Sequence, residues 1–519
     1  MGLHRPAAPG QPVGGIGRLA PHRAGADHHR RHRQLADPGT QAVRGRPAAR
    51  RAQGILRPEG RRRLVSPRVV VLGGGPAGDV AALRAAQLGA DTVLIERAEL
   101  GGTCLNWGCI PTKSLLAGAD LLRRIRHASD YGIMVEEPTI DFARMMERKE
   151  EVVLKMRSGV EAACKRKKVR VVREQGVIEG DEVVCGKEHL PFDHLIVCVG
   201  TVASGLPGID MDHPCVVTSD GIVRLQKIPK KMLVIGGGVI GCEFASLFAA
   251  LGTQVTVVEV LPQILTGVDP RIVAQFRKLV EAQGVTFHTG HNVESVDYRT
   301  ASLIAHLDDG TDVDADLLLV SVGRKPETGR IGLEEAGVVV DERGYVEVDD
   351  QLHTKNEKIW SAGDCIGGLQ LAHLASAEAA RAVENALGHD IMAMDRTVVP
   401  SCIYTHPEIA MVGLNSETAK AGGYEVKVGQ ARFLGNGKAL GEGEPDGLAQ
   451  LYSDAKTGVL LGATVMGVHA VEIIHEVGVA ISDGLTVDEL GAIIHAHPTV
   501  SETIMDAAEQ AAGVAPYLS

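Results

Sequence analysis

Two cysteines are the residues of this 519-residue chain whose spacing most clearly indicates chemistry. Cys104 and Cys109 lie in GGTCLNWGCIPTK, residues 101–113, with four residues between them, a spacing that can close a small disulfide ring. The next run, SLLAGADLLRRI, has a helical pattern, so we expect Cys109 near a helix N-terminus, where a thiolate is stabilised. Zinc would need further ligands at fixed offsets, and the nearest Cys or His residues are His127 and Cys164. We therefore predict a redox-active dithiol and no metal.

A histidine and a glutamate near the C-terminus are the candidate base and its partner. A dithiol substrate must lose protons to become nucleophilic, and His titrates near neutral pH. His497, followed by Pro498, is the best candidate, and Glu502 can orient its imidazole and stabilise the charged form. The alternative for His497 is a loop histidine held by the proline. We expect His495 to be structural.

The elements that must position these residues include one unit that occurs twice. RVVVLGGGPAGDVAALRAAQLGADTVLIE from Arg68 and KMLVIGGGVIGCEFASLFAALGTQVTVVE from Lys231 align without a gap. Each copy contains a buried strand, a glycine turn, an amphipathic helix and a second buried strand that ends in Glu. This order is typical of a βαβ unit of a parallel α/β sheet.

The glycines of both copies have the spacing of a dinucleotide-binding turn: Gly73, Gly75 and Gly78, then Gly236, Gly238 and Gly241. The first glycine permits the tight turn, the second lets the backbone approach a pyrophosphate, and the third lets the helix pack closely. Glu96 and Glu259 follow at equal distances, as ribose-binding carboxylates should. Two dinucleotides are expected, against the alternative of two ordinary strand–helix turns. No Arg cluster follows Glu259, which favours NAD over NADP in the second copy.

Together these segments resemble the pyridine nucleotide-disulfide oxidoreductase family, over about residues 67–519. The resemblance continues in VGRKPET at 322–328, WSAGDC at 360–365, LAHLASAEA at 371–379 and HAHPTVSET at 495–503. Within the family, the chain is most similar to members that oxidise dihydrolipoamide. The resemblance implies an α/β fold with two Rossmann-like domains, one for FAD and one for NAD, and a C-terminal α+β dimerisation domain.

The resemblance also implies roles for single residues. Cys104 exchanges with the substrate, and Cys109 is the thiolate that lies against the flavin ring. The implied FAD-site residues are Gly73, Gly75, Gly78, Glu96, Lys113, Gly176, Gly200, Thr201, Asp364 and Ala372. The implied NAD-site residues are Gly236, Gly238, Gly241, Glu243, Glu259 and Gly323. Lys113 and Glu243 match an ion pair near the reactive flavin nitrogen, and taken singly they could be ordinary surface charges. The segment CVGT at 198–201 departs from the Ala-Thr-Gly-Ser of the family.

Five segments are predicted: an Arg-rich leader at 1–66, the first part of the FAD domain at 67–215, the NAD domain at 216–330, a central FAD-binding part at 331–395 and an interface domain at 396–519. The resemblance implies a homodimer, because the His497 segment of the family reaches the flavin site of the partner subunit. It also implies a carrier partner, the lipoyl-bearing domain of a 2-oxo acid dehydrogenase or glycine cleavage complex. The rival hypotheses are a glutathione-type or mercuric-type reductase and a non-enzymatic flavoprotein scaffold.

Charge and composition indicate which partners and which cellular compartment to expect for this protein. Residues 1–68 carry a net charge of +12 and the remainder −23, and this acidic remainder argues against nucleic acid as the main partner. No window approaches the roughly 20 apolar residues of a membrane helix. The leader cannot bury enough apolar surface to order and lacks a secretory apolar segment, so we expect a disordered extension. Nine cysteines without a disulfide framework indicate a reducing compartment, the cytoplasm.

Overall fold

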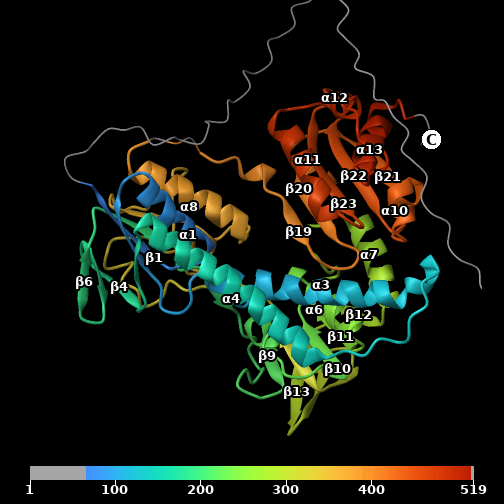
Figure 1. The fold of residues 1–519 in the computed structure, drawn as a ribbon, viewed down its shortest axis with the longest axis horizontal. Helices are drawn as coiled ribbons and strands as arrows, with labels where there is room; N and C mark the ends of the chain where they lie inside the picture. Colours follow the sequence, from blue (N-terminus) through green and yellow to red (C-terminus); the bar gives the residue numbers. More distant parts are fainter. Residues whose placement is uncertain (1–65, 390, 392, 516–519) are drawn as a thin grey trace, which may run out of the picture. The chain divides into compact units, whose positions relative to one another are not determined.

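The computed structural model describes residues 66–389, 391 and 393–515. The leader predicted at 1–66 lies outside these residues, apart from Ser66. Two parallel sheets are followed by an antiparallel sheet (Figure 1), which confirms the predicted α/β class with a C-terminal α+β part. Within the described residues, no helix combines the length and the apolar character that crossing a membrane requires.

The first parallel sheet has five strands in the order β18-β7-β1-β2-β3. Its strands are β1 (Arg68–Leu72), β2 (Asp91–Ile95), β3 (Arg170–Val172), β7 (His194–Val197) and β18 (Ile359–Ser361). Alternate residues of β1 face opposite sides. Val69 and Val71 pack toward α1 (Pro76–Gln87) and α8 (Ala372–Ala386). Val70 and Leu72 pack toward the antiparallel strands β4 (Gly176–Glu179), β5 (Glu182–Cys185) and β6 (Glu188–Pro191).

The second parallel sheet repeats this design, with five strands in the order β12-β11-β10-β16-β9. Its strands are β9 (Val216–Thr218), β10 (Lys231–Ile235), β11 (Gln254–Glu259), β12 (Val285–Thr289) and β16 (Leu317–Val320). One face is covered by α6 (Val239–Ala250) and α7 (Pro270–Ala282). The other face is covered by β13 (Val293–Arg299), β14 (Ser302–Leu307) and β15 (Asp312–Ala315). The repeated sequence therefore folds into two equivalent sheets.

Three helices between β2 and β3 carry the dithiol and its surroundings: α2 (Gly102–Asn106), α3 (Cys109–Arg126) and α4 (Phe142–Lys167). The long helix α4 packs against α1 and against α3 (Figure 1). Its N-terminus is capped by Asp141, whose side chain accepts a hydrogen bond from the backbone N–H of Arg144. The short strands β8 (Thr201–Ala203) and β17 (Arg324–Pro326) pair antiparallel and link the chain between the two parallel sheets.

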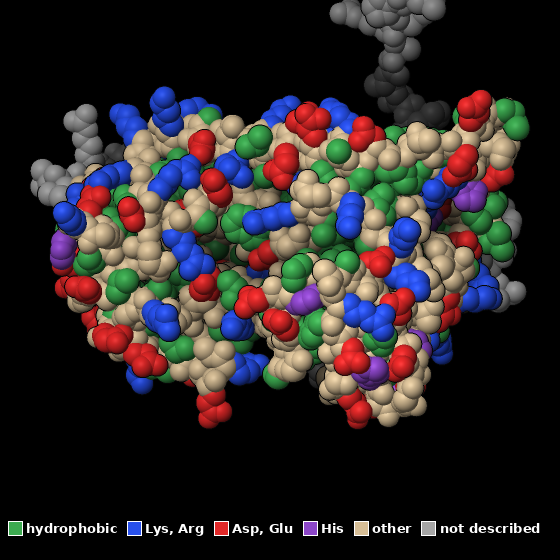
Figure 2. All heavy atoms as spheres, turned by 90° about the horizontal axis from the view of Figure 1, so that it is seen from below, with side chains coloured by type: hydrophobic (Ala, Val, Ile, Leu, Met, Phe, Trp, Pro, Cys, Tyr) green, Lys and Arg blue, Asp and Glu red, His purple; other side chains and the backbone are tan. Residues whose placement is uncertain are grey.

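The C-terminal sheet is antiparallel, in the order β19-β20-β23-β22-β21. Its strands are β19 (Ser401–Ile403), β20 (Ile409–Gly413), β21 (Val426–Arg432), β22 (Leu448–Asp454) and β23 (Leu460–Met466). Its helices are α9 (Ser416–Ala421), α10 (Gly437–Gly441), α11 (Ala470–Ser482), α12 (Val487–Gly491) and α13 (Glu502–Ala512). Helices α11, α12 and α13 share one apolar core with the sheet. Figure 2 shows basic and acidic side chains interspersed over one face of the molecule, with no field of a single sign.

The third glycine of each motif is required by packing. A Cβ on Gly78 would lie 1.7 Å from the carbonyl oxygen of Gly73, and one on Gly241 would lie 2.0 Å from that of Gly236. Gly73 and Gly236 have φ of +101° and +103°, which side chains rarely adopt. The first and third glycines of each turn thus perform the structural roles that the sequence predicts.

We expect Gly78→Ala to destabilise the protein by about 3 kcal/mol or more, because the new methyl group meets backbone rather than a movable side chain. Thermal unfolding measures the loss. Gly159→Ala is the matched control: Gly159 lies in α4 with no heavy atom within 4 Å of its added Cβ, so the change should be neutral or stabilising by up to about 1 kcal/mol. Equal stability of the two variants would contradict the packing argument.

Candidate active site

The two cysteines of the predicted dithiol lie on adjacent short elements. Cys104 belongs to α2 and Cys109 is the first residue of the 18-residue helix α3, which confirms the expected helix N-terminus. In setting the pKa values of the two thiols, Cys104 acts as a hydrogen-bond donor to Cys109. Trp107, between them in sequence, packs against the apolar core and lines the same cavity as both cysteines.

The two thiols differ in acidity. The hydrogen bond from Cys104 lowers the pKa of Cys109, and the Lys113 ammonium lowers it further; burial and Glu243 oppose them, and the result is a pKa of about 7. The same hydrogen bond and burial raise the pKa of the Cys104 thiol. Near neutral pH a large fraction of Cys109 is therefore ionised while Cys104 keeps its proton, a division that suits one nucleophile and one exchanging sulfur.

Lys113 and Glu243 form an ion pair that joins α3 of the first parallel-sheet unit to α6 of the second. Lys113 Nζ, on α3, lies 2.8 Å from both carboxylate oxygens of Glu243, on α6. The Glu243 side chain is only 5% exposed, so the pair replaces lost hydration with direct hydrogen bonds. Tyr404 completes the arrangement: its backbone N–H donates to Glu243 Oε1 over 3.0 Å, and its ring centroid lies 4.5 Å from Lys113 Nζ.

One cavity of about 2140 Å³ joins the dithiol to both glycine turns. Its volume exceeds the roughly 300–1,000 Å³ of a typical small-ligand site, so the residues present fit two dinucleotides. The sequence-predicted residues that line it are Gly73, Gly75, Glu96, Cys104, Cys109, Lys113, Gly176, Gly200, Thr201, Gly236, Gly238, Glu243, Glu259, Gly323, Asp364 and Ala372. Gly78 and Gly241 lie behind the turns and act in packing.

The two acidic residues after the glycine turns have the same hydrogen bonds in both copies. Glu96 accepts from the backbone N–H groups of Gly74 and Ala98, each over 2.7 Å. Glu259 accepts from Gly237 over 2.7 Å and from Leu261 over 2.8 Å. These bonds hold each carboxylate at the mouth of its turn, where its remaining lone pairs can accept from ribose hydroxyls.

Asp364 is held through Thr201 and Arg324. Thr201 Oγ1 donates to Asp364 Oδ2 over 3.0 Å, and Arg324 Nε donates to Thr201 Oγ1 over 2.8 Å. Burial raises the pKa of Asp364, against the lowering effect of the Thr201 hydrogen bond and the Arg324 charge. Arg324 was not among the predicted site residues, although its place beside Gly323 in VGRKPET was a usable signal. Tyr404 was also missed, because it precedes His-Pro in a segment without a recognised motif.

The predicted base, His497, is not among the described residues that line the dithiol cavity of its own chain. His497 Nδ1 lies 2.8 Å from Glu502 Oε1, and the Thr499 N–H donates to Glu502 Oε2 over 2.8 Å. Burial opposes ionisation of Glu502, but these hydrogen bonds give it a lowered pKa. The His497 side chain is 79% exposed and is not among the described residues that line the cavity. His495, with its side chain 6% exposed and paired with Glu476, fits the expected structural role.

Comparisons with known proteins agree with this geometry. The family model described as pyridine nucleotide-disulphide oxidoreductase matches residues 67–379, and the model of that family's dimerisation domain matches 399–508. The chain is 39% identical to the dihydrolipoyl dehydrogenase of Bacillus subtilis, over 86% of this chain and 98% of that protein. It is 41% identical to the dihydrolipoyl dehydrogenase of Chlamydia trachomatis, over 85% of this chain and 95% of that protein.

Two solved structures are similar in fold. LpdA from Mycobacterium tuberculosis has a TM-score of 0.80 at 27% identity, covering 86% of this chain and 99% of that chain. RclA from Escherichia coli, an HOCl-induced flavoprotein disulfide reductase, has a TM-score of 0.78 at 29% identity, covering 85% of this chain and 99% of that chain.

Removing the Lys113 charge should make Cys109 a weaker acid. In Lys113→Met we expect the midpoint of Cys109 ionisation to rise from about 7 by about one pH unit, because the thiolate loses a cation and faces an unpaired Glu243. Ultraviolet thiolate absorbance of the reduced protein, with Cys109→Ser as the blank, measures this midpoint. Lys113→Arg, which keeps the charge, should shift it less, and an unchanged midpoint in Lys113→Met would refute the assignment.

Proposed function

Because the chain belongs to the pyridine nucleotide-disulphide oxidoreductase family, we propose that it is a dihydrolipoyl dehydrogenase with FAD and NAD as its cofactors. It oxidises the dihydrolipoyl group of a carrier domain to the lipoyl disulfide. One observation carries the proposal: a single cavity contains a dithiol of unequal acidity and two dinucleotide-binding turns. The names of relatives at 36–41% identity over most of the chain support the same substrate.

The reaction that the residues of this chain carry out is thiol–disulfide exchange. The cycle starts from the oxidised pair, in which a disulfide joins Cys104 and Cys109. A substrate thiolate attacks Cys104 Sγ, the Cys104–Cys109 bond breaks, and Cys109 leaves as the thiolate that its surroundings stabilise. The second substrate thiolate then attacks the substrate sulfur of the mixed disulfide, which releases the lipoyl disulfide and Cys104. The imidazole of His497 takes up a proton from the substrate dithiol, and Glu502 stabilises the resulting imidazolium. When bound, FAD and NAD carry the two electrons onward as a hydride equivalent.

A homodimer completes the site in this proposal. Two observations support a base supplied by the partner subunit. Residues 399–508 match a dimerisation domain, and His497 is exposed and does not line the cavity of its own chain. Glu259 supports NAD over NADP, since a carboxylate repels a 2′-phosphate. The cysteines outside the dithiol are buried or half-buried free thiols, which supports a reducing compartment, the cytoplasm.

Steady-state kinetics test the substrate. We expect dihydrolipoamide with NAD to turn over, and oxidised glutathione with NADPH to be at least about a hundredfold poorer in kcat/KM, because the site binds neither that substrate nor the 2′-phosphate productively. Cys104→Ser should abolish dihydrolipoamide oxidation while FAD stays bound. Full activity of Cys104→Ser, or a preference for glutathione, would exclude the proposal.

A mixing experiment tests the shared site. His497→Gln should slow dithiol oxidation by about two orders of magnitude or more, as loss of a general base does. When Cys104→Ser and His497→Gln chains are co-expressed equally, about half of the dimers are mixed and each mixed dimer holds one intact site, so activity should recover to about a quarter of the unaltered level. No recovery would show that each chain uses its own histidine.

A further inference from the structure

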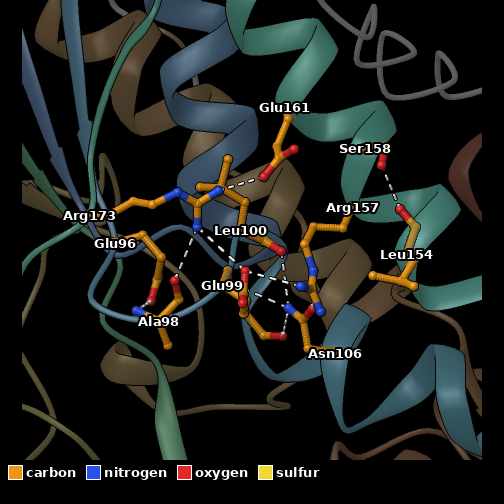
Figure 3. Close-up of polar contacts among 11 residues, drawn as sticks. Glu96, Ala98, Glu99, Leu100, Asn106, Leu154, Arg157, Ser158, Glu161 and Arg173 are labelled. Carbon is orange, nitrogen blue, oxygen red and sulfur yellow. Dashed lines mark hydrogen bonds and ion pairs between the residues drawn. The ribbon is translucent and has the colours of Figure 1, made fainter. Parts of the chain in front are cut away.

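Helix α4 lies outside the cofactor cavity yet is bonded to the segment that contains the dithiol (Figure 3). Arg157, in the second half of α4, donates from Nε to Asn106 Oδ1 over 3.0 Å. Nη1 of the same guanidinium lies 3.1 Å from Glu99 Oε2. Its side chain is 21% exposed and that of Glu99 is 42% exposed, so the part-buried bond to Asn106 is the better protected of the two charge-assisted contacts.

Asn106 accepts the hydrogen bond from Arg157 and donates hydrogen bonds of its own to the backbone around Cys104. It is the last residue of α2, and its Nδ2 donates to the carbonyl oxygens of Gly102, over 2.9 Å, and Leu100, over 3.0 Å. With both donors directed at these carbonyls, the amide oxygen faces Arg157. One side chain therefore ties the beginning of α2, its end and helix α4 together, and Cys104 lies inside this turn.

A second arginine holds the other end of the segment. Arg173, just after β3, donates to the Ala98 carbonyl oxygen over 3.3 Å and lies 3.4 Å from Glu99 Oε2. It also pairs with Glu161 on α4. In Figure 3 the two arginines converge on Glu99 from either side. The Glu99 carboxylate therefore joins α4 and the end of β3 to the residues that lead into the dithiol.

Helix α4 is itself well anchored, so it can act as a fixed support. Lys149, 2% exposed, donates from Nζ to the carbonyl oxygen of Val223 over 2.9 Å. Val153 and Cys164 are buried against neighbouring elements. A side chain on such a helix is held within a narrow range of positions, as a positioning residue must be.

We propose that Arg157 is a positioning residue for the dithiol: through Asn106 and Glu99 it holds Cys104 against Cys109 while the Cys104 sulfur exchanges its bonding partner. We call the contacts of Arg157 with Asn106 and Glu99 the brace. The role of the brace in turnover rests on the proposed function, but the contacts themselves are a property of this chain. Thiol–disulfide exchange needs the attacking, central and leaving sulfurs in a defined arrangement, and a displacement of about 1 Å can reduce a rate a hundredfold. Arg157 acts without touching the reacting atoms.

Cys109 reports on this geometry. The groups that act on its ionisation are Cys104 from α2, Lys113 from α3 and Glu243 from α6, and the contact from Cys104 contributes most. Of these three groups, the brace positions only Cys104. Loosening it weakens the Cys104–Cys109 hydrogen bond and leaves the Lys113–Glu243 pair in place, so the thiol acidity of Cys109 should fall.

The test is the midpoint of Cys109 ionisation in Arg157→Gln, in the FAD-bound protein reduced with dithiothreitol. Ultraviolet thiolate absorbance, with Cys109→Ser as the blank, should give a midpoint about one pH unit higher, a tenfold loss of acidity. Arg157→Lys, which can keep one charged contact, should shift it less. Arg144→Gln is the matched control, because Arg144 lies on the same helix and its side chain pairs with Glu147 and Glu151, also on α4; it should change nothing.

Activity separates the brace from general damage. Dihydrolipoamide oxidation by Arg157→Gln should fall about tenfold, whereas NADH oxidation by ferricyanide, which draws electrons from the flavin without the dithiol, should be unchanged. An unshifted Cys109 midpoint overturns the inference, as does an equal loss in both activities. If Arg157→Gln does not fold with FAD, the same titration is made on Glu99→Gln. A shifted Cys109 midpoint in that variant supports the inference, and an unshifted midpoint contradicts it. Absence of dihydrolipoamide turnover in the unaltered protein would reject the proposed function and leave the titration valid.

Discussion

The ion pair between half-buried Lys113 and buried Glu243 is the interaction on which the rest of the site depends. Removing two charges from water costs several kcal/mol per ion, and only close, well-directed hydrogen bonds compensate for it. Here both Glu243 oxygens lie 2.8 Å from the ammonium and the Tyr404 N–H supplies a third contact. The contacts come from three parts of the chain, so the pair holds the first parallel unit, the second parallel unit and the C-terminal part in one arrangement around the dithiol.

The same pair sets the electrostatics of the cavity. The ammonium favours the thiolate of Cys109, while Glu243 opposes it and limits the effect. The largest contribution to the acidity of Cys109 comes from the neighbouring Cys104 hydrogen bond, so the position of α2 relative to α3 affects the chemistry. A brace from α4 to α2 therefore matters to the chemistry although it lies outside the cavity.

The repeated unit shows how one local design is completed by different parts of the chain. In the second sheet the outer strand beside β16 is β9, which precedes the repeat in sequence. In the first sheet the equivalent place beside β7 is taken by β18, far downstream. In both sheets the added strand covers the equivalent hydrophobic edge. The pairing of β18 also brings Asp364, three residues after that strand, to the first dinucleotide turn. A strand pairing of long range thus brings the residues that follow β18 to the cavity beside the first glycine turn.

Much of this protein was determined by its sequence alone. The two glycine turns, the acidic residue after each, the short spacing of the cysteines and the helical run after Cys109 are local patterns, because turn conformation, strand alternation and helix starts depend on neighbouring residues. Tertiary structure decided the rest. Arg157 with Asn106, Arg324 with Thr201 and Tyr404 with Glu243 join residues more than fifty positions apart. Spacing along the chain carries no signal for such pairs, since only the packing of α4, β17 and β19 against the dithiol and the turns brings their side chains within hydrogen-bonding distance.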